Sequence, residues 1–355
     1  MVFLGILALG TLAFSINAIF GWSGFGRAKN PEIEFGAQAA LFLAFALVVL
    51  VHAEFFREAR WRSRVVTLMA WAAVVHLVIF LLEATHLFSP ASLPLELFRT
   101  TSDIGRPSGL MSEPSYFGAF AGLYGGPLLL VRSVPHYRWR CVLAIALFAC
   151  AVIIRAKTFV PVMICEFCLV IWMRGRSVLK LRYLPIAIAV VLISLYVIIA
   201  NAALDLQDNL SSVMRIGSAQ LASNVAIRGY GLTGIGFGQF HYFFRPQFAP
   251  SYLFLSSEAR EQFSLSATMR ASTYNFFIRM LLETGIVGLL LFTGMIYSVL
   301  RSARNNLSAD SQLGIFLLAG SLGFLFTQDP YFYPPLALAL AILLGRIGTH
   351  LDVKV

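Results

Sequence analysis

The chain has 355 residues, 59% of them hydrophobic, and a mean hydropathy of +0.79, against about 45–50% apolar residues in soluble proteins. This composition excludes an ordinary soluble enzyme and predicts an all-α polytopic membrane protein. The net charge of +10 lies mostly in basic clusters between apolar segments, so it suits an anionic membrane surface and does not indicate nucleic-acid binding.

The first apolar segment, Val2 to Phe20, is long enough to span a bilayer. No small-x-small cleavage site follows it, so we interpret it as a membrane helix and not as a signal peptide. With about 17 to 25 residues per span, about ten transmembrane helices can be placed, in a single domain over 1–355. The predicted spans are 2–20, 37–53, 65–82, 115–131, 141–154, 158–173, 183–201, 273–299, 313–327 and 334–347.

Basic residues concentrate in the short connections 54–64, 132–140, 174–182 and 301–304. The positive-inside rule makes these connections cytoplasmic, and both termini with them. The loops 21–36, 83–114, 202–272 and 328–333 then lie on the outer face. Long segments cross a membrane largely regardless of their charge, so topology does not explain the five arginines of 202–272. A local role such as binding of an anion would explain them.

The segment Arg106-Pro-Ser-Gly-Leu-Met-Ser-Glu-Pro-Ser-Tyr-Phe-Gly118 leads into the predicted span 115–131. Pro114 suits the first turn of a helix, and a helix start offers free amide donors to an anion, together with Arg106. Glu113 would stay ionised there and suits a base or a group that orients an acceptor. Alternatively, Glu113 only satisfies the helix start and Arg106 is solvated.

Two basic residues, Arg155 and Lys157, occupy the short outer turn between spans 141–154 and 158–173. Basic residues are disfavoured in short outer turns, so this pair indicates a bound anion. The alternative is that both side chains reach lipid phosphate along the membrane surface.

In the long loop, Arg215, Arg228 and Arg270 are the strongest candidates for an anion contact, ahead of Arg245 and Arg260. Any one of them can instead be a solvated loop charge. Glycines at 234, 236 and 238 predict a close backbone turn against a sugar or phosphate. The glycines at 229, 231 and 234 match a dinucleotide-binding pattern by letter, but no βαβ context surrounds them.

Polar residues inside predicted spans form a further group. Asn275, Arg279 and Glu283 follow one another at helical spacing, so they form a stripe that either lines a cavity or contains an ion pair used for packing. Glu166 stands in the span 158–173 without an evident partner. We predict no metal site. Acidic residues that stand close together in the loops are expected to be solvated, and the four cysteines are expected to pack within the apolar spans.

The order of these motifs resembles the O-antigen polymerase and ligase superfamily. The Arg106 to Gly118 segment is followed by Ala156-Lys-Thr158, by Arg215, by Gly231-Leu-Thr-Gly-Ile-Gly-Phe-Gly-Gln-Phe240, and by Thr273-Tyr-Asn-Phe-Phe277 with Leu282-Glu-Thr-Gly-Ile-Val-Gly288. The Glu-Pro-Ser variant at 113–115 is most similar to the polymerases of exopolysaccharide and O-antigen repeat units. The resemblance covers roughly residues 100 to 345.

The resemblance implies a metal-independent glycosyltransferase of the GT-C type, with a large periplasmic loop, in the bacterial inner membrane. Its substrates would be undecaprenyl diphosphate-linked oligosaccharides, with no nucleotide sugar or other cofactor, and its partners a flippase and a chain-length regulator. Lys157 and Arg215 stand where the family binds the lipid diphosphate. Tyr274 stands where the ligases have a histidine, which favours a polymerase.

The leading hypothesis is therefore a polymerase that transfers a growing lipid-linked glycan onto an incoming lipid-linked repeat unit. Fixed cations stabilise the negative charge of the leaving diphosphate, and a carboxylate helps the acceptor hydroxyl to attack. The alternatives are a ligase that transfers glycan to lipid A core or protein, and a transporter of the same lipid. We expect catalytic roles for Glu113, Arg215 and Tyr274 and substrate contacts from Arg106, Lys157, Arg228, Arg270 and Arg279.

Overall fold

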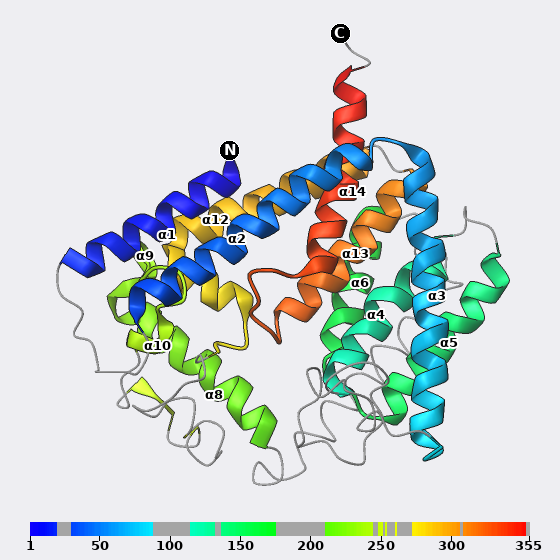
Figure 1. The fold of residues 1–355 in the computed structure, drawn as a ribbon, viewed down its shortest axis with the longest axis horizontal. Helices are drawn as coiled ribbons and strands as arrows, with labels where there is room; N and C mark the ends of the chain where they lie inside the picture. Colours follow the sequence, from blue (N-terminus) through cyan, green and yellow to red (C-terminus); the bar gives the residue numbers. More distant parts are fainter. Residues whose placement is uncertain are drawn as a thin grey trace. The chain divides into compact units, whose positions relative to one another are not determined.

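The structure is a computed structural model that describes most of the chain. The described residues are 1–19, 30–87, 114–131, 136–174, 210–243, 248–250, 253, 260, 272–305 and 308–352. The predicted span 183–201 and the candidate residues Arg106, Glu113 and Arg270 lie outside them. Every regular element named within these ranges is a helix (Figure 1), which confirms the all-α prediction for this part of the chain.

Each predicted span within the described residues contains a helix. Helix ends differ from the predicted ones by up to six residues, because α2, α3 and α12 extend beyond their apolar segments. The elements are α1 (Val2–Ile19), α2 (Pro31–Phe55), α3 (Ala59–Ala84), α4 (Pro114–Leu130), α5 (Tyr137–Ile153), α6 (Phe159–Arg174), α8 (Leu210–Val225), η5 (Ala226–Tyr230), α9 (Gly231–Thr233), α10 (Phe240–Phe243), α12 (Phe276–Asn305), α13 (Ala309–Leu325) and α14 (Pro334–Asp352).

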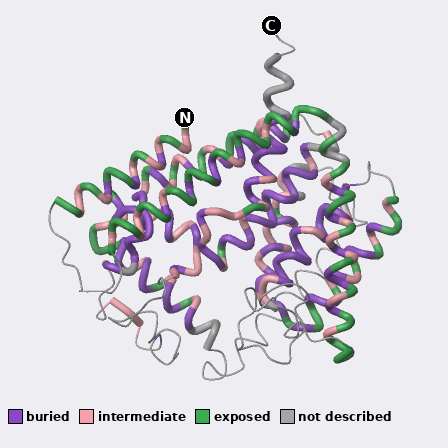
Figure 2. The backbone as a smooth tube through the Cα atoms, in the orientation of Figure 1, coloured by how far each residue is buried: buried purple, intermediate pink, exposed green. Residues whose placement is uncertain are grey.

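Four of the described helices are long and apolar enough to cross a membrane, namely α1, α2, α3 over Arg64–Ala84, and α12. Large apolar side chains on α2 and α3 point outward, among them Leu47, Leu50, Leu68 and Trp71. Figure 2 shows the corresponding exposed stretches in green along both helices. An apolar surface on long helices is what lipid contact requires, so the structure agrees with a multi-pass membrane protein.

The chain folds into two compact units. Unit 1 consists of Met1–Val48, Ala202–Leu300 and Leu325–Ala337, and unit 2 consists of Val49–Asn201, Arg301–Phe324 and Leu338–Val355. Within unit 1, α1 packs on α2 through Phe3, whose ring lies 6.2 Å from that of Phe42. A Cβ at Gly5 of α1 would lie 3.5 Å from the side chain of Leu291, so α1 also contacts α12.

Unit 2 is built around α4, which packs on both α5 and α6. Its glycines allow this close approach, because a Cβ at Gly118 would lie 2.4 Å from that of Ala156. A Cβ at Gly122 would lie 2.4 Å from the side chain of Val162. Small residues at helix contacts are typical of membrane bundles, where van der Waals packing drives association.

The long loop predicted at 202–272 contains helical structure. Within it lie α8, the π-helical turn η5 and the short helices α9 and α10. The buried residues Met214, Ser218, Leu221 and Val225 recur at helical spacing, which gives α8 one buried face. The sequence did not predict this helix, because small and polar residues interrupt the helical spacing of its apolar residues.

Candidate functional site

Arg215 lies on α8 beside a cluster of buried side chains in unit 1. The residue before it, Met214, is 1% exposed and belongs to this cluster, whereas Arg215 itself is half-buried. We call the group the α8 cluster. It consists of Met214, Leu221, Ala222, Val225, Ala226, Ile235, Phe240, Leu253 and Leu282.

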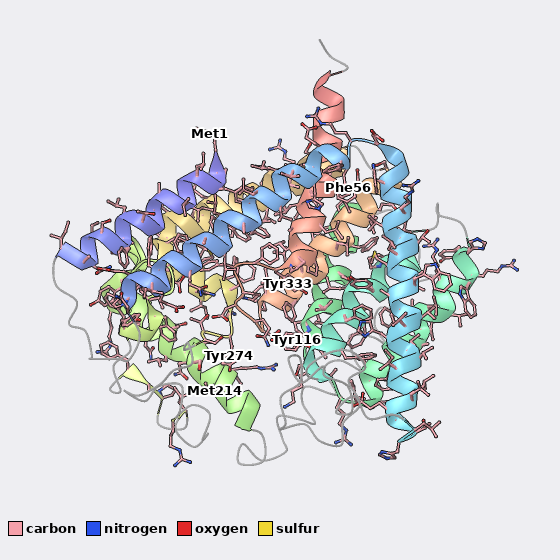
Figure 3. All side chains as sticks on the ribbon, viewed as in Figure 1. Met1, Phe56, Tyr116, Met214, Tyr274 and Tyr333 are labelled. Carbon is pink, nitrogen blue, oxygen red and sulfur yellow. The ribbon has the colours of Figure 1, made fainter. Side chains whose placement is uncertain are left out.

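Tyr274 packs against the same α8 cluster, together with Ile278 and Leu281 of α12. Figure 3 labels Tyr274 and Met214, which come from the segment before α12 and from α8. Apolar packing therefore holds the helix that carries Arg215 against the residues that begin α12. Of the residues that the sequence predicts to be catalytic, Tyr274 thus contacts this core, and Arg215 lies on the helix whose buried face forms part of it.

The backbone of Tyr274 is held in the left-handed region, with φ of 49°. This conformation costs a non-glycine residue about 1–3 kcal/mol, so its surroundings must maintain it. Its N–H donates to Ser272 Oγ at 3.1 Å, and Ser272 Oγ donates to Asp329 Oδ1 at 2.7 Å. Thr273 donates to Asp329 Oδ2 from both its N–H and its hydroxyl, at 2.8 and 2.9 Å. Asp329 thereby anchors both residues that precede Tyr274.

Asn275 caps the N-terminus of α12. Its Oδ1 accepts hydrogen bonds from the N–H groups of Phe277 and Ile278, both at 3.1 Å, which is the usual role of an N-cap side chain. Its Nδ2 donates to the carbonyl of Phe326 at 3.2 Å. The predicted polar stripe therefore begins with a capping residue, and this fixes where α12 starts after Tyr274.

Arg279 is fully enclosed by protein partners and is only 1% exposed. Its Nε lies 3.1 Å from Glu283 Oε1 in an ion pair. Its Nη2 donates to Gln38 Oε1 at 2.9 Å, and its Nη1 donates to the carbonyl of Asp329. Its guanidinium lies 3.9 Å from the ring centre of Tyr331, whose hydroxyl donates to Glu283 Oε2. The stripe was predicted either to line a cavity or to contain an ion pair used for packing, and the structure contains the ion pair.

The glycine-rich turn at 234–238 is hydrogen-bonded to an interruption in α12. Gly285 has φ of 72° and ψ of 178°, which breaks the helical path. The carbonyls of Leu282 and Glu283 accept hydrogen bonds from Ile235 N and Gly236 N, both at 2.9 Å. The predicted span 273–299 is therefore not one regular helix. Its interruption is tolerated because the glycine-rich turn satisfies the freed backbone groups.

Protein atoms fill the space beside the glycines of this turn. A Cβ at Gly234 would lie 2.6 Å from the carbonyl oxygen of Glu283, and one at Gly236 would lie 2.9 Å from Phe14 Cα. A Cβ at Gly238 would lie 2.7 Å from the side chain of Gln38. The close approach that the sequence predicts is thus made to α1, α2 and α12. A contact of this turn with a sugar or phosphate stays a prediction.

In unit 2, Lys157 lies in the turn between α5 and α6 and is partly buried. Thr158 Oγ1 donates to the carbonyl of Ser115 in the first turn of α4, and Ala156 lies against Gly118. Helix α4 begins at Pro114, as its sequence predicts. The turn that carries Lys157 is therefore hydrogen-bonded to the first turn of α4. In the sequence, Glu113 immediately precedes this helix.

The remaining loop arginines differ in their surroundings. Arg228 is exposed, and its guanidinium lies 4.2 Å from the ring centre of Phe248 in a cation–π contact. Arg260 is also exposed, whereas Arg245 and Arg270 lie outside the described residues. Within the described ranges, no three His, Cys, Asp or Glu side chains come together in a group that could hold a metal ion.

Sequence reasoning did not identify Asp329, Gln38 and Tyr331 as site residues. Gln328 and Asp329 are two consecutive polar residues between two apolar segments. This pattern is the sequence signal from which Asp329 could have been predicted. Gln38 sits in an apolar helix, where a polar side chain needs a partner. Neither pattern says which residue the partner is.

Comparisons with protein families and with curated proteins find no match to the chain. The resemblance to the polymerase and ligase superfamily therefore rests on the motifs and their order.

Proposed function

We propose that this protein is a membrane glycosyltransferase that polymerises undecaprenyl diphosphate-linked repeat units into a bacterial surface polysaccharide. The observation that carries the proposal is that α8, the helix on which Arg215 lies, packs through its buried face against Tyr274 in the α8 cluster. A cation held by a packed helix is preorganised to stabilise a leaving diphosphate, because little reorganisation is needed during the reaction.

A second observation, in unit 2, is the position of Lys157. It lies in a turn that is bound to the first turn of α4, and a helix start carries free N–H donors that favour an anion. In the proposed reaction, the acceptor hydroxyl attacks the sugar carbon, the bond to the diphosphate breaks, and the diphosphate leaves with the bonding electrons. The resemblance assigns diphosphate contacts to Lys157 and to Arg215, and Glu113 or another base would receive the acceptor proton.

The proposed topology has about ten membrane helices, as their lengths allow, with the reaction on the periplasmic face of the inner membrane. Single cysteines at Ser63, Ser177 and Ser257, in a background without native cysteines, test it in intact cells. An impermeant thiol reagent should label only the third. Labelling at Ser177 without labelling at Ser257 would invert the topology and remove the periplasmic reaction.

The activity is tested with purified protein in nanodiscs and an undecaprenyl diphosphate-linked repeat unit, with the products separated on a gel. A polymerase gives a ladder, whereas a ligase gives one transfer to an added acceptor, and a transporter gives no new glycosidic bond. Arg215→Ala and Lys157→Ala should each lower turnover by roughly 100-fold. Arg215→Lys should recover part of it, because lysine keeps the charge but loses the two-pronged geometry.

The control is Arg301→Ala, which removes an exposed arginine from the last turns of α12. It should leave the ladder unchanged. Equal ladders from Arg215→Ala and Arg301→Ala would show that Arg215 is a solvated charge. Glu113→Gln and Tyr274→Phe then separate the roles at the acceptor. A dead Tyr274→Phe protein beside an active Glu113→Gln protein would move the acceptor contact to Tyr274.

A further inference from the structure

Glu166 is a buried carboxyl group in α6 of unit 2. It is 2% exposed, and neither of its carboxyl oxygens has a hydrogen-bond partner among the described residues. Isolated ionised carboxylates are very costly to bury in apolar surroundings, whereas the neutral acid is tolerated far better. Polar groups with this degree of burial inside membrane bundles commonly mark a functional site.

Two neighbouring helices make room for this carboxyl group by carrying glycine where they face it. A Cβ at Gly126 of α4 would lie 2.1 Å from Glu166 Oε2. A Cβ at Gly320 of α13 would lie 2.9 Å from Glu166 Oε1 and equally close to Leu123. The carboxyl group is therefore enclosed between α4, α6 and α13, and any larger residue at Gly126 would collide with it.

The other titratable side chains on the helices that carry and face Glu166 are Tyr116 and Tyr124 on α4, and Cys165, Cys168 and the terminal Arg174 on α6. The part of α13 from 311 to 325 contains no titratable residue.

Two described cations of neighbouring elements have partners of their own. Arg140 of α5 donates to the carbonyls of Leu128 and Val131, and Arg304 at the end of α12 lies over the ring of Trp172. On α3, the ring of His76 lies 4.1 Å from that of Phe120 in a tilted contact. Among the described side chains, none forms an ion pair with Glu166.

We propose that Glu166 is a proton-binding site inside the helix bundle of unit 2. Its carboxyl group holds a proton while α4, α6 and α13 are packed, and it releases that proton to water only when these helices separate. Ionisation and helix packing are therefore coupled, because the glycine faces leave no room for water around a charged carboxylate.

Infrared spectroscopy of the protein in nanodiscs at pH 7 tests the proposal without any glycan substrate. The difference spectrum between the native protein and the Glu166→Gln variant should contain the C=O stretch of a protonated carboxyl group, on the high-frequency side of the amide I band. An ordinary glutamate is ionised at this pH, since its pKa is about 4.3. In D2O the band should shift slowly, at the rate at which the bundle opens.

The matched control is Glu32→Gln, which alters an exposed glutamate at the start of α2 and should not remove the band. Gly126→Ala should shift or abolish the band by displacing the carboxyl group. If Gly126→Ala does not fold, the comparison of the native protein with Glu166→Gln still decides the proposal. A native spectrum without the band, or carboxylate bands that respond to sodium or potassium, would overturn it. A deuterium shift that is complete on mixing would refute the coupling to helix packing.

Discussion

Arg279 in unit 1 and Glu166 in unit 2 are both ionisable side chains buried in apolar helices, and the protein accommodates them in opposite ways. Arg279 has an ion pair with Glu283, two further hydrogen bonds and an aromatic ring over its guanidinium. Glu166 has no hydrogen bond among the described residues and lies against two glycine faces.

The difference follows from which of the two groups can lose its charge. Arginine stays protonated in proteins, so a buried guanidinium must collect acceptors and a counter-charge. Glutamic acid can be neutralised by a single proton, and the neutral carboxyl group costs far less to bury without a counter-charge. The polar atoms around Arg279 come from three segments, namely α12, α2 and the connection that contains Asp329, whereas the helices that face Glu166 carry glycine.

The largest expected effect comes from Arg279→Met. Removal of the guanidinium leaves Glu283 buried without its partner, and breaking a buried ion pair costs about 3–5 kcal/mol. The thermal midpoint in detergent, measured by intrinsic fluorescence, should therefore fall sharply. Arg301→Met, at an exposed position of α12, should leave it unchanged. Equal midpoints for the two variants would mean that the Arg279 ion pair does not stabilise unit 1.

Gly285→Ala should come next in size. A Cβ there would lie 2.3 Å from the carbonyl oxygen of Leu232, and its φ of 72° suits only glycine. The backbone conformation alone costs about 1–3 kcal/mol for other residues. On the same helix, Gly294 has open space beside it, so Gly294→Ala should stabilise the protein by up to about 1 kcal/mol. Thermal unfolding of both variants measures the contrast, and a destabilised Gly294→Ala would contradict it.

Asp329→Asn probes the anchor of Tyr274. Asp329 Oδ2 accepts two hydrogen bonds from Thr273 while Oδ1 accepts one from Ser272. The amide nitrogen of asparagine cannot accept, so at least one buried donor loses its partner at a cost of about 1–3 kcal/mol. Hydrogen exchange should show faster opening at 272–275. Unchanged protection there would show that Asp329 does not hold this segment.

The smallest effect is expected from Glu166→Gln, and it sharpens the comparison when it is paired with Glu283→Gln. Gln has the shape and neutrality of a protonated Glu, so the change at 166 should alter stability by at most about 1 kcal/mol. The same change at 283 leaves Arg279 without a counter-charge and should cost about 3 kcal/mol. Thermal midpoints of the two variants measure the difference. Similar losses would contradict a neutral Glu166.

Hydropathy was sufficient to predict the described helices outside 202–272, because a helix that crosses a membrane is a long apolar segment. The start of α4 at Pro114 also followed from local chemistry, since proline at the first turn loses no hydrogen bond. The spacing of Arg279 and Glu283 allowed the ion pair but left a cavity-lining role open. Helix α8 was missed, because its apolar period is interrupted by small and polar residues.

The sequence by itself determined the all-α class and the apolar spans, because those depend on residues close together in the chain. It also determined which residue types could bind an anion. Only the tertiary structure decided that Asp329 anchors the segment before Tyr274 and that the glycine-rich turn closes the interruption of α12 at Gly285. Both depend on hydrogen bonds between residues about 50 positions apart. Such pairs form only when packing brings them together, and the choice among possible partners is made by the geometry of the whole unit.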